Sequence, residues 1–238
     1  MTLDPSLLLN AYAAGVFPMA DSREAAELYW VEPRERAIIP LGGFHVSRSL
    51  DRTLRSGRFE VTRDKVFAEV VAGCAARPET WINHEIEQAV NALHAAGHAH
   101  SIEVWRGGAL VGGLYGVKLG RAFFGESMFS RERDASKIAM AWLVARLRAG
   151  HFTLLDCQIM TPHLASLGAV NVPAPSYAAL LSAAIAGVVG GSAGAVGSGV
   201  GAALPPPEFG TLDGLVATGA GGGSPPGKVI SQFLTQTS

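Results

Sequence analysis

Three short runs of strand-forming residues constrain the fold more than any other feature of the sequence. Apolar, β-branched and aromatic side chains recur in residues 102–105, 110–117 and 122–124. Gly107, Gly108 and Gly120 lie in the segments that separate these runs. Short strands joined by glycine-containing turns are typical of an antiparallel meander. We therefore expect three neighbouring strands here, in a sheet that is mainly antiparallel.

The third run leads into a segment of mixed character, G-E-S-M-F-S-R at residues 125–131. The carboxylate of Glu126, two hydroxyls and the guanidinium of Arg131 stand beside large apolar side chains where the strand is expected to end. Polar groups among apolar ones are typical of a ligand pocket. A hydrogen-bonded loop over the core is the alternative, and the residues alone leave it open.

Length and charge set broad limits. A chain of 238 residues with 48% hydrophobic residues is long enough for one large or two small domains with a real core. Lys and Arg total 19 against 20 for Asp and Glu, so any nucleic-acid contact must come from local clustering of basic residues. With only Cys74 and Cys157, and no basic and apolar leader before Leu3, we expect a reduced, cytoplasmic protein.

Four arginines recur in residues 48–58 at spacings of four, three and three, which would put them on one face of a helix. They are Arg48, Arg52, Arg55 and Arg58. A surface that contacts phosphates and a solvated helix face both fit such a row.

A strand is expected at residues 153–159, T-L-L-D-C-Q-I. Asp156 and Gln158 are two residues apart, so strand alternation predicts that they share a face, with Cys157 on the opposite one. An unpaired buried polar group costs on the order of 1–3 kcal/mol, so each of the two should have a defined partner.

Three histidines, His94, His98 and His100, follow a predicted helix, and the first two have the spacing of paired metal ligands. No carboxylate or cysteine completes a set locally, and the helix dipole already favours a histidine at a helix C-terminus. We therefore expect no metal site.

The sequence changes character from Ala174 onward, where Glu208, Asp213 and Lys228 are the charged residues. Residues 178–204 carry no charge and could span a membrane by length, with Gly190 and Gly194 as a G-x-x-x-G pair. Glycine is frequent there and favours neither a helix nor lipid contact. We expect a last helix over 178–187, then a flexible tail, and no membrane association.

A series of short blocks runs through the chain: L-L-L-N-A-Y at 7–12, H-V-S-R-S at 45–49, T-W-I at 80–82, F-G-E-S-M-F-S-R at 124–131, D-C-Q at 156–158 and S-L-G-A at 166–169. In this order the blocks resemble those of the bacterial leucyl/phenylalanyl-tRNA-protein transferases. The resemblance covers about the first 173 residues. The family usually has a basic pair after the next proline, whereas Ala174-Pro175-Ser176 stands here.

The resemblance implies an α+β fold in which a GNAT-like acyltransferase domain with a mainly antiparallel sheet, residues 64–187, follows a small N-terminal α/β domain, residues 1–63. Residues 188–238 would be a Gly/Ala/Pro-rich flexible tail. The implied activity moves Leu, Phe or Met from aminoacyl-tRNA to the α-amino group of proteins that begin with Arg or Lys, which marks them for degradation. We expect a monomer without metal or cofactor.

The resemblance also implies site residues. Asp156 and Gln158 match the catalytic pair, and Glu126 matches a carboxylate near the basic side chain of the acceptor. The expected apolar pocket consists of Trp30, Trp81, Leu114, Phe123, Met140, Leu143 and Leu155. The arginine row then becomes the expected tRNA surface.

An aminoacyl ester is already activated, so holding an amine against its carbonyl can remove roughly 7–11 kcal/mol of the barrier without a cofactor or a covalent nucleophile. We expect Gln158 to accept a hydrogen bond from the amine, and Asp156 to polarise it or take the proton. Three alternatives remain open: a coenzyme A-dependent N-acetyltransferase, a hydrolase using Cys157 and His163, and a non-catalytic tRNA-binding adaptor. Against the first, residues 130–135 lack the glycines of a turn that binds a pyrophosphate.

Overall fold

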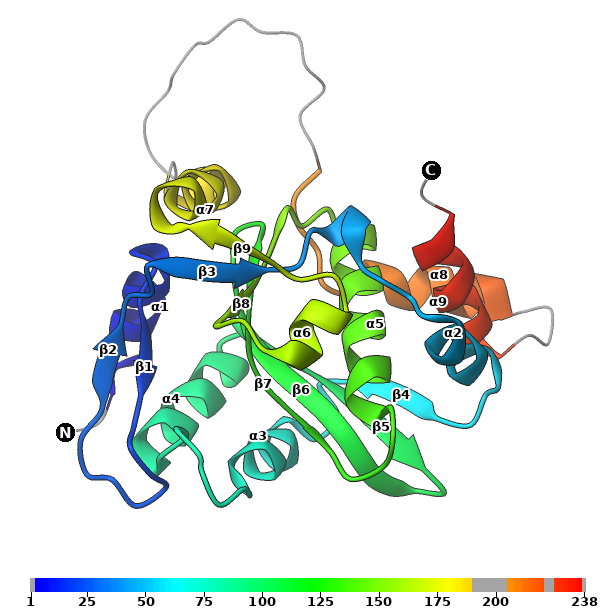
Figure 1. Cartoon of the computed structure of the whole chain (residues 1–238), viewed down its shortest axis with the longest axis horizontal. Helices are drawn as coiled ribbons and strands as arrows, with labels where there is room; N and C mark the ends of the chain where they lie inside the picture. Colours follow the sequence, from blue (N-terminus) through cyan, green and yellow to red (C-terminus); the bar gives the residue numbers. More distant parts are fainter. Residues whose placement is uncertain (1–2, 190–204, 221–224, 237–238) are drawn as a thin grey trace, which may run out of the picture.

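The computed structural model describes residues 3–189, 205–220 and 225–236 (Figure 1). The strands are β1 (Phe17–Met19), β2 (Tyr29–Val31), β3 (Glu35–Ile38), β4 (Glu60–Arg63), β5 (Ala99–Arg106), β6 (Ala109–Leu119), β7 (Ala122–Ser130), β8 (Leu154–Gln158) and β9 (Val170–Pro173). The helices are α1 (Pro5–Ala13), α2 (Arg48–Arg55), α3 (Phe67–Ala75), α4 (His84–Ala95), α5 (Ala135–Ala149), α6 (Pro162–Ser166), α7 (Ala174–Val189), α8 (Thr211–Ala220) and α9 (Pro226–Thr235), with a 3-10 turn at Leu41–Gly43.

One seven-stranded sheet organises the molecule, in the order β4-β5-β6-β7-β8-β3-β9. Its neighbours pair antiparallel except β7 and β8, which are parallel, and β1 and β2 form a separate two-stranded sheet. The fold is thus a mixed α+β fold with a mainly antiparallel sheet, as expected.

The meander predicted from the three strand-forming runs is confirmed as β5, β6 and β7. Leu114 in the middle strand lies opposite Ile102 on one side and Met128 on the other. Gly107 and Gly108 form the first turn with φ angles of 56° and 79°. Two consecutive positive φ angles are the requirement of a tight two-residue hairpin turn, which explains the glycine pair.

Helices cover both faces of the sheet (Figure 1). Helix α5 packs on one face, where Phe123 and Leu155 belong to its core cluster. Helices α3 and α4 pack on the other face with α1 and α7, where Phe124 and Leu154 are buried. Consecutive residues of β7 and β8 therefore serve opposite cores, as strand alternation requires.

The expected boundary at residue 63 does not coincide with a break in the structure, because β3 and β4 both belong to the seven-stranded sheet. Strand β3 pairs with β8 and β9, two strands that come more than 100 residues later in the sequence, and its residues Ala37 and Ile38 are buried between them. The division into separately folding domains stays a prediction.

The segment expected to be a tail contains two helices, α8 and α9, where few charges had suggested only flexibility. Phe209 stacks on His100 and Phe123, with ring centroids 4.3 Å and 5.4 Å away. Leu212 and Ile230 are buried against the core on the α5 side. The remainder of that tail, with Gly190 and Gly194, lies outside the described residues.

Within the described ranges, no helix is both long enough and apolar enough to cross a bilayer.

Candidate functional site

A cavity opens where the parallel strands β7 and β8 separate. They pair from Ala122 to Phe124 and from Leu154 to Asp156. Beyond that point β7 continues to Ser130 while β8 ends at Gln158. The space between the diverging ends is about 340 Å³, in the size range of pockets for small ligands.

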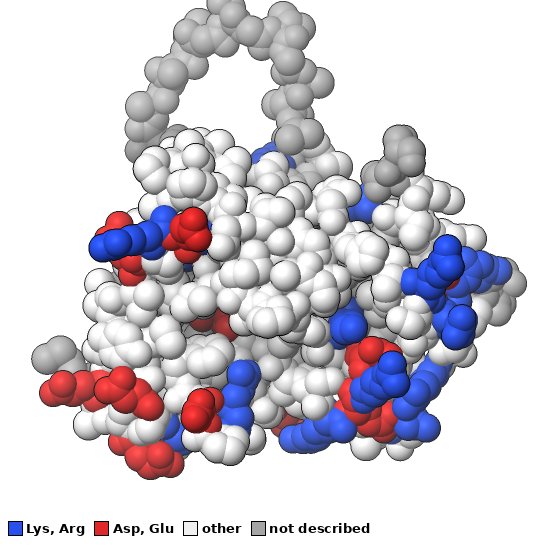
Figure 2. Space-filling model, in the orientation of Figure 1, with Lys and Arg blue, Asp and Glu red and all other residues white. Residues whose placement is uncertain are grey.

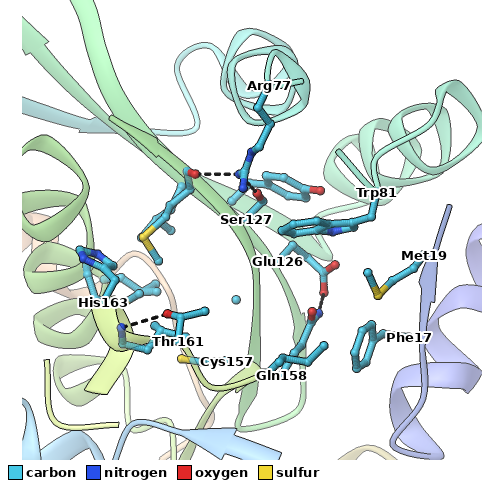
Figure 3. A pocket seen from close by; sticks show the side chains of 18 residues that line it. Phe17, Met19, Arg77, Trp81, Glu126, Ser127, Cys157, Gln158, Thr161 and His163 are labelled. Atoms are coloured by element: carbon cyan, nitrogen blue, oxygen red, sulfur yellow. Dashed lines mark hydrogen bonds between the residues drawn. The ribbon is translucent and has the colours of Figure 1, made fainter. Parts of the chain in front are cut away.

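Most of the cavity wall is apolar. Its apolar and aromatic residues are Phe17, Met19, Trp81, Leu114, Tyr115, Met128, Met140, Leu143, Cys157, Ile159 and Leu164. The polar groups are Arg77, Glu126, Ser127, Gln158, Thr161 and His163. Figure 3 shows Phe17 and Met19 on one side of the cavity, and Thr161 and His163 on the opposite side. An apolar wall with a few polar groups suits a ligand that is itself apolar at one end and polar at the other.

Six of the residues predicted from the sequence line this cavity: Trp81, Leu114, Met140, Leu143, Glu126 and Gln158. Phe123, Leu155, Trp30 and Asp156 are not among the lining residues. Phe123 and Leu155 are fully buried in the core that supports the wall, and Trp30 is 39% exposed in the β1–β2 sheet.

Glu126 and Gln158 meet across the gap between the strands. The side-chain Nε2 of Gln158 donates a hydrogen bond of 2.8 Å to Oε1 of Glu126 (Figure 3). Glu126 is only 8% exposed. Burial raises the pKa of the Glu126 carboxyl from 4.5 to about 7, although Tyr12 and Gln158 oppose the shift. This carboxyl therefore changes its charge near neutral pH, whereas an ordinary glutamate does not.

The backbone of Gln158 departs from the strand, with a φ angle of 63°. Its N–H donates to Oδ1 of Asp156 at 2.7 Å, which is the hydrogen bond of an Asx turn. The turn brings Gln158 into the cavity wall, whereas Asp156 is not among the lining residues and bonds to Arg36 and Tyr177. The prediction that both side chains have defined partners is confirmed.

Asp156 is fully buried and held by two residues that the sequence analysis missed. Arg36 donates to its carboxylate from Nε at 3.0 Å and from Nη2 at 2.7 Å, and the hydroxyl of Tyr177 donates at 2.7 Å. The available signal was an arginine beside an apolar strand-like run, E-R-A-I-I, at residues 35–39. A charge in such a run requires a buried counter-charge, and Asp156 was already a candidate.

Arg77 is a third residue that the sequence analysis missed. It donates from Nη2 to Oγ of Ser127 at 2.7 Å and to the carbonyl of Met128 at 3.0 Å. Its guanidinium lies 5.0 Å from the ring centre of Trp81. Arg77 thus fixes the end of β7 and one face of the Trp81 ring (Figure 3).

Burial raises the pKa of the Cys157 thiol, with the charge of Asp156 acting in the same direction. A nucleophilic cysteine needs the opposite shift, so the environment of Cys157 disfavours the hydrolase alternative. Burial and the charge of Lys137 lower the pKa of His163, which keeps its imidazole neutral at physiological pH.

Two of the three histidines, His94 and His100, approach the carboxylate of Asp64. Nδ1 of His100 lies 2.9 Å from it and Nδ1 of His94 lies 4.0 Å from it, while Nδ1 of His94 is also 2.8 Å from the carbonyl of Ala99. Across the described ranges, no group of three metal-ligating side chains is close enough to hold an ion.

The arginine row lies along α2, on the side of the molecule where Figure 2 shows Lys and Arg concentrated. Arg48, Arg52 and Arg55 line one open groove together with Val46, Asp51, Ser56 and Thr235, and Asp51 lies 4.0 Å from Arg55. Helix α2 ends at Arg55, so Arg58 lies beyond it and pairs with Glu132 at 2.9 Å. Three of the four arginines share the predicted face.

Comparisons with known proteins agree with the resemblance. The family model of the leucyl/phenylalanyl-tRNA protein transferases matches residues 38–182, and the model of their N-terminal domain matches residues 1–34. A relative from Rhizorhabdus wittichii is 59% identical, covering 99% of both chains. One from Novosphingobium aromaticivorans is 54% identical, covering 99% of this chain and 97% of its own. Both are named leucyl/phenylalanyl-tRNA-protein transferase.

A solved structure, the C-terminal domain of a putative lysylphosphatidylglycerol synthetase from Agrobacterium fabrum, aligns with a TM-score of 0.40 and 15% identity. The alignment covers 82% of this chain and 74% of that chain.

Proposed function

We infer, because the chain belongs to the leucyl/phenylalanyl-tRNA protein transferase family, that it transfers the aminoacyl group of an aminoacyl-tRNA to the α-amino group of a protein. The donors that we propose are Leu, Phe and Met, and the acceptors are proteins that begin with Arg or Lys. The observation that carries the proposal is the Glu126–Gln158 pair in the wall of an otherwise apolar cavity.

The reaction joins the amine nitrogen of the acceptor to the carbonyl carbon of the donor. The bond between that carbon and the ribose oxygen of the tRNA breaks, and the proton lost by the amine ends on the ribose hydroxyl. Since the ester is activated, holding the two reactants together can supply roughly 7–11 kcal/mol. Gln158 serves this step because its Nε2 is committed to Glu126, which leaves Oε1 to accept a hydrogen bond from the attacking amine.

Donor selection follows from the apolar wall of Leu114, Met140 and Leu143. A methylene in an apolar pocket discriminates by about 1–3 kcal/mol, so this wall favours large apolar donors over small ones and excludes Met only weakly.

Acceptor selection is assigned to Glu126, the one carboxylate among the lining residues. In its ionised form it attracts the cationic side chain of an N-terminal Arg or Lys.

The tRNA is proposed to bind through phosphates along α2. Arg48, Arg52 and Arg55 share a groove, and phosphate contacts of this kind position an RNA without reading its sequence. Arg58 lies at the edge of this surface, beyond the end of α2, and its contribution is smaller because it already pairs with Glu132.

We also propose that the core of the chain is a GNAT-like acyltransferase domain in the cytoplasm. The features that support a GNAT-like arrangement are the parallel pair β7–β8, which diverges around the cavity, and the register shift in β6 at Tyr115 and Gly116.

The proposal is tested by incubating the purified protein with leucyl-tRNA labelled in the amino acid and a peptide that begins with Arg. Label should move to the peptide, and a matched peptide that begins with Glu should receive far less. Binding of tRNA without transfer would contradict the proposal and favour the adaptor. Modification of the peptide only with acetyl-coenzyme A would favour the acetyltransferase.

A further inference from the structure

We propose that Arg36 and Tyr177 are positioning residues for the transfer step. Their hydrogen bonds to Asp156 hold its carboxylate in place, so that Asp156 orients Gln158 toward the cavity and does not accept the proton of the amine. This inference rests on the proposed function, and Arg36 and Tyr177 together are called the clamp below.

The carboxylate of Asp156 has no capacity left for a substrate. Its Oδ1 accepts from Nε of Arg36 and from the backbone N–H of Gln158. Its Oδ2 accepts from Arg36 again and from the hydroxyl of Tyr177. A carboxylate offers about four lone-pair positions, and all are used here. With a side chain that is 0% exposed, Asp156 has no direct contact with an amine in the cavity.

The clamp is itself rigid. The guanidinium of Arg36 lies between the rings of Phe17 and Tyr177, 4.7 Å and 4.6 Å from their centres. Its Nη1 donates to the carbonyl of Gly15 at 2.8 Å, and the residue is 1% exposed. Contacts with β1, β8 and α7 therefore hold one cation in place. A buried ion pair with all of its hydrogen bonds made is strongly destabilised when one partner is removed.

The clamp reaches the cavity through the backbone of Gln158. A positive φ angle costs a non-glycine residue of order 1–3 kcal/mol, so it persists only where surrounding contacts enforce it. The bond from the Gln158 N–H to Asp156 is such a contact. If Asp156 shifts, Gln158 can relax toward an ordinary strand conformation, and its Nε2 then moves away from Glu126.

A purely structural ion pair would behave differently, and the chain contains one for comparison. Arg146 is 3% exposed and donates to Asp213 at 2.6 Å and to the carbonyl of Phe209 at 2.8 Å. It joins α5 to α8 and lines no part of the cavity. Arg146→Lys is thus the matched control for Arg36→Lys.

The experiment uses the full-length chain with Arg36→Lys, Tyr177→Phe and Arg146→Lys, and measures the single-turnover transfer rate, KM for both substrates and Tm. Tyr177→Phe keeps the ring over Arg36 and removes one hydroxyl, so it remains informative if Arg36→Lys does not fold. Misplaced reacting groups lose roughly 10- to 100-fold in rate, which is the loss expected for the clamp variants with KM nearly unchanged. Arg146→Lys should lower Tm but keep the rate per folded molecule.

A double-mutant cycle tests whether the clamp acts through Gln158. In a Gln158→Ala background, Tyr177→Phe should change the rate by less than about twofold, because residues that act as a unit are non-additive. The inference would be overturned if the clamp variants transferred as fast per folded molecule as Arg146→Lys. It would also be overturned if the rate losses of Tyr177→Phe and Gln158→Ala multiplied in the double variant.

The clamp is also tested independently of activity by a crystal structure of Tyr177→Phe or Arg36→Lys. The inference expects Gln158 to lose its bond to Glu126, and an unchanged Gln158 would overturn it. If the wild-type chain transfers no label, the proposed function fails while this structural test still decides about the clamp.

Discussion

Nε2 of Gln158 and Oε1 of Glu126 are 2.8 Å apart, and this hydrogen bond spans the gap between two strands that have ceased to pair. The two residues are 32 positions apart in sequence and lie beyond the last paired positions of β7 and β8. The bond orients the amide of Gln158 and places a buried carboxylate within reach of the same ligand. Catalytic positioning and acceptor recognition are therefore proposed to depend on one another.

Glu126→Gln should weaken the preference for acceptors that begin with Arg or Lys, because it removes the buried negative charge while keeping the shape. Hydrogen bonds to charged groups contribute about 1.5–3 kcal/mol, so the ratio of kcat/KM for an Arg peptide over a Leu peptide should fall roughly 10- to 100-fold. The measurement is peptide competition with a fixed concentration of leucyl-tRNA. An unchanged ratio would assign acceptor recognition to another group.

The pH dependence of kcat/KM for an Arg peptide should follow the charge of Glu126. Burial raises the pKa of this carboxyl to about 7, so the ionised form that attracts a cation increases as pH rises through neutrality. We expect kcat/KM to increase between about pH 6 and pH 8 and then to level off, as for a single essential carboxylate. In Glu126→Gln the component of the rise near pH 7 should disappear and leave only the rise that comes from deprotonation of the attacking α-amino group, whose ordinary pKa is about 8. A profile unchanged from the wild type would point to a different titrating group.

Arg52→Ala should weaken tRNA binding and reduce its dependence on salt. Each phosphate contact contributes about 0.7 to 0.9 to the slope of log K against log salt, so the slope should fall by about that amount. Arg34→Ala is the matched control, since Arg34 is exposed before β3 and lies outside the α2 groove. Equal slopes for the two variants in a filter-binding titration would remove α2 from the tRNA surface.

The sequence predicted those parts of the fold and site that depend on local pattern. The meander followed from runs of strand-forming residues separated by glycine-containing segments. Glu126 stood out as a carboxylate beside large apolar side chains, although the strand expected to end before it, β7, continues to Ser130. Arg36 was missed because its partner, Asp156, lies 120 residues away. The turn at Gln158 was missed because alternation assumes a regular strand, whereas the backbone of Gln158 has a φ angle of 63° and bonds to Asp156.

The helices α8 and α9 show a second reason why part of the fold could not be predicted from the sequence. Their sequence has few charges and many small residues, which is also the composition of a linker. Single large residues, such as Phe209, attach this segment to the core because they pack on an aromatic residue of the sheet. Periodicity within the segment carries no information about that partner.

Phe209→Ala should destabilise the fold by roughly 3–5 kcal/mol, the usual cost of removing a buried phenylalanine side chain. Phe209 is 3% exposed, stacks on Phe123 and His100, and its carbonyl accepts a bond from Arg146. Urea denaturation followed by tryptophan fluorescence measures the loss in the free energy of unfolding. Leu215→Ala is the control, because this leucine on α8 is 46% exposed and its removal should change stability by less than about 0.5 kcal/mol. If both variants unfold at the wild-type urea concentration, residues 205–220 do not contribute to the core.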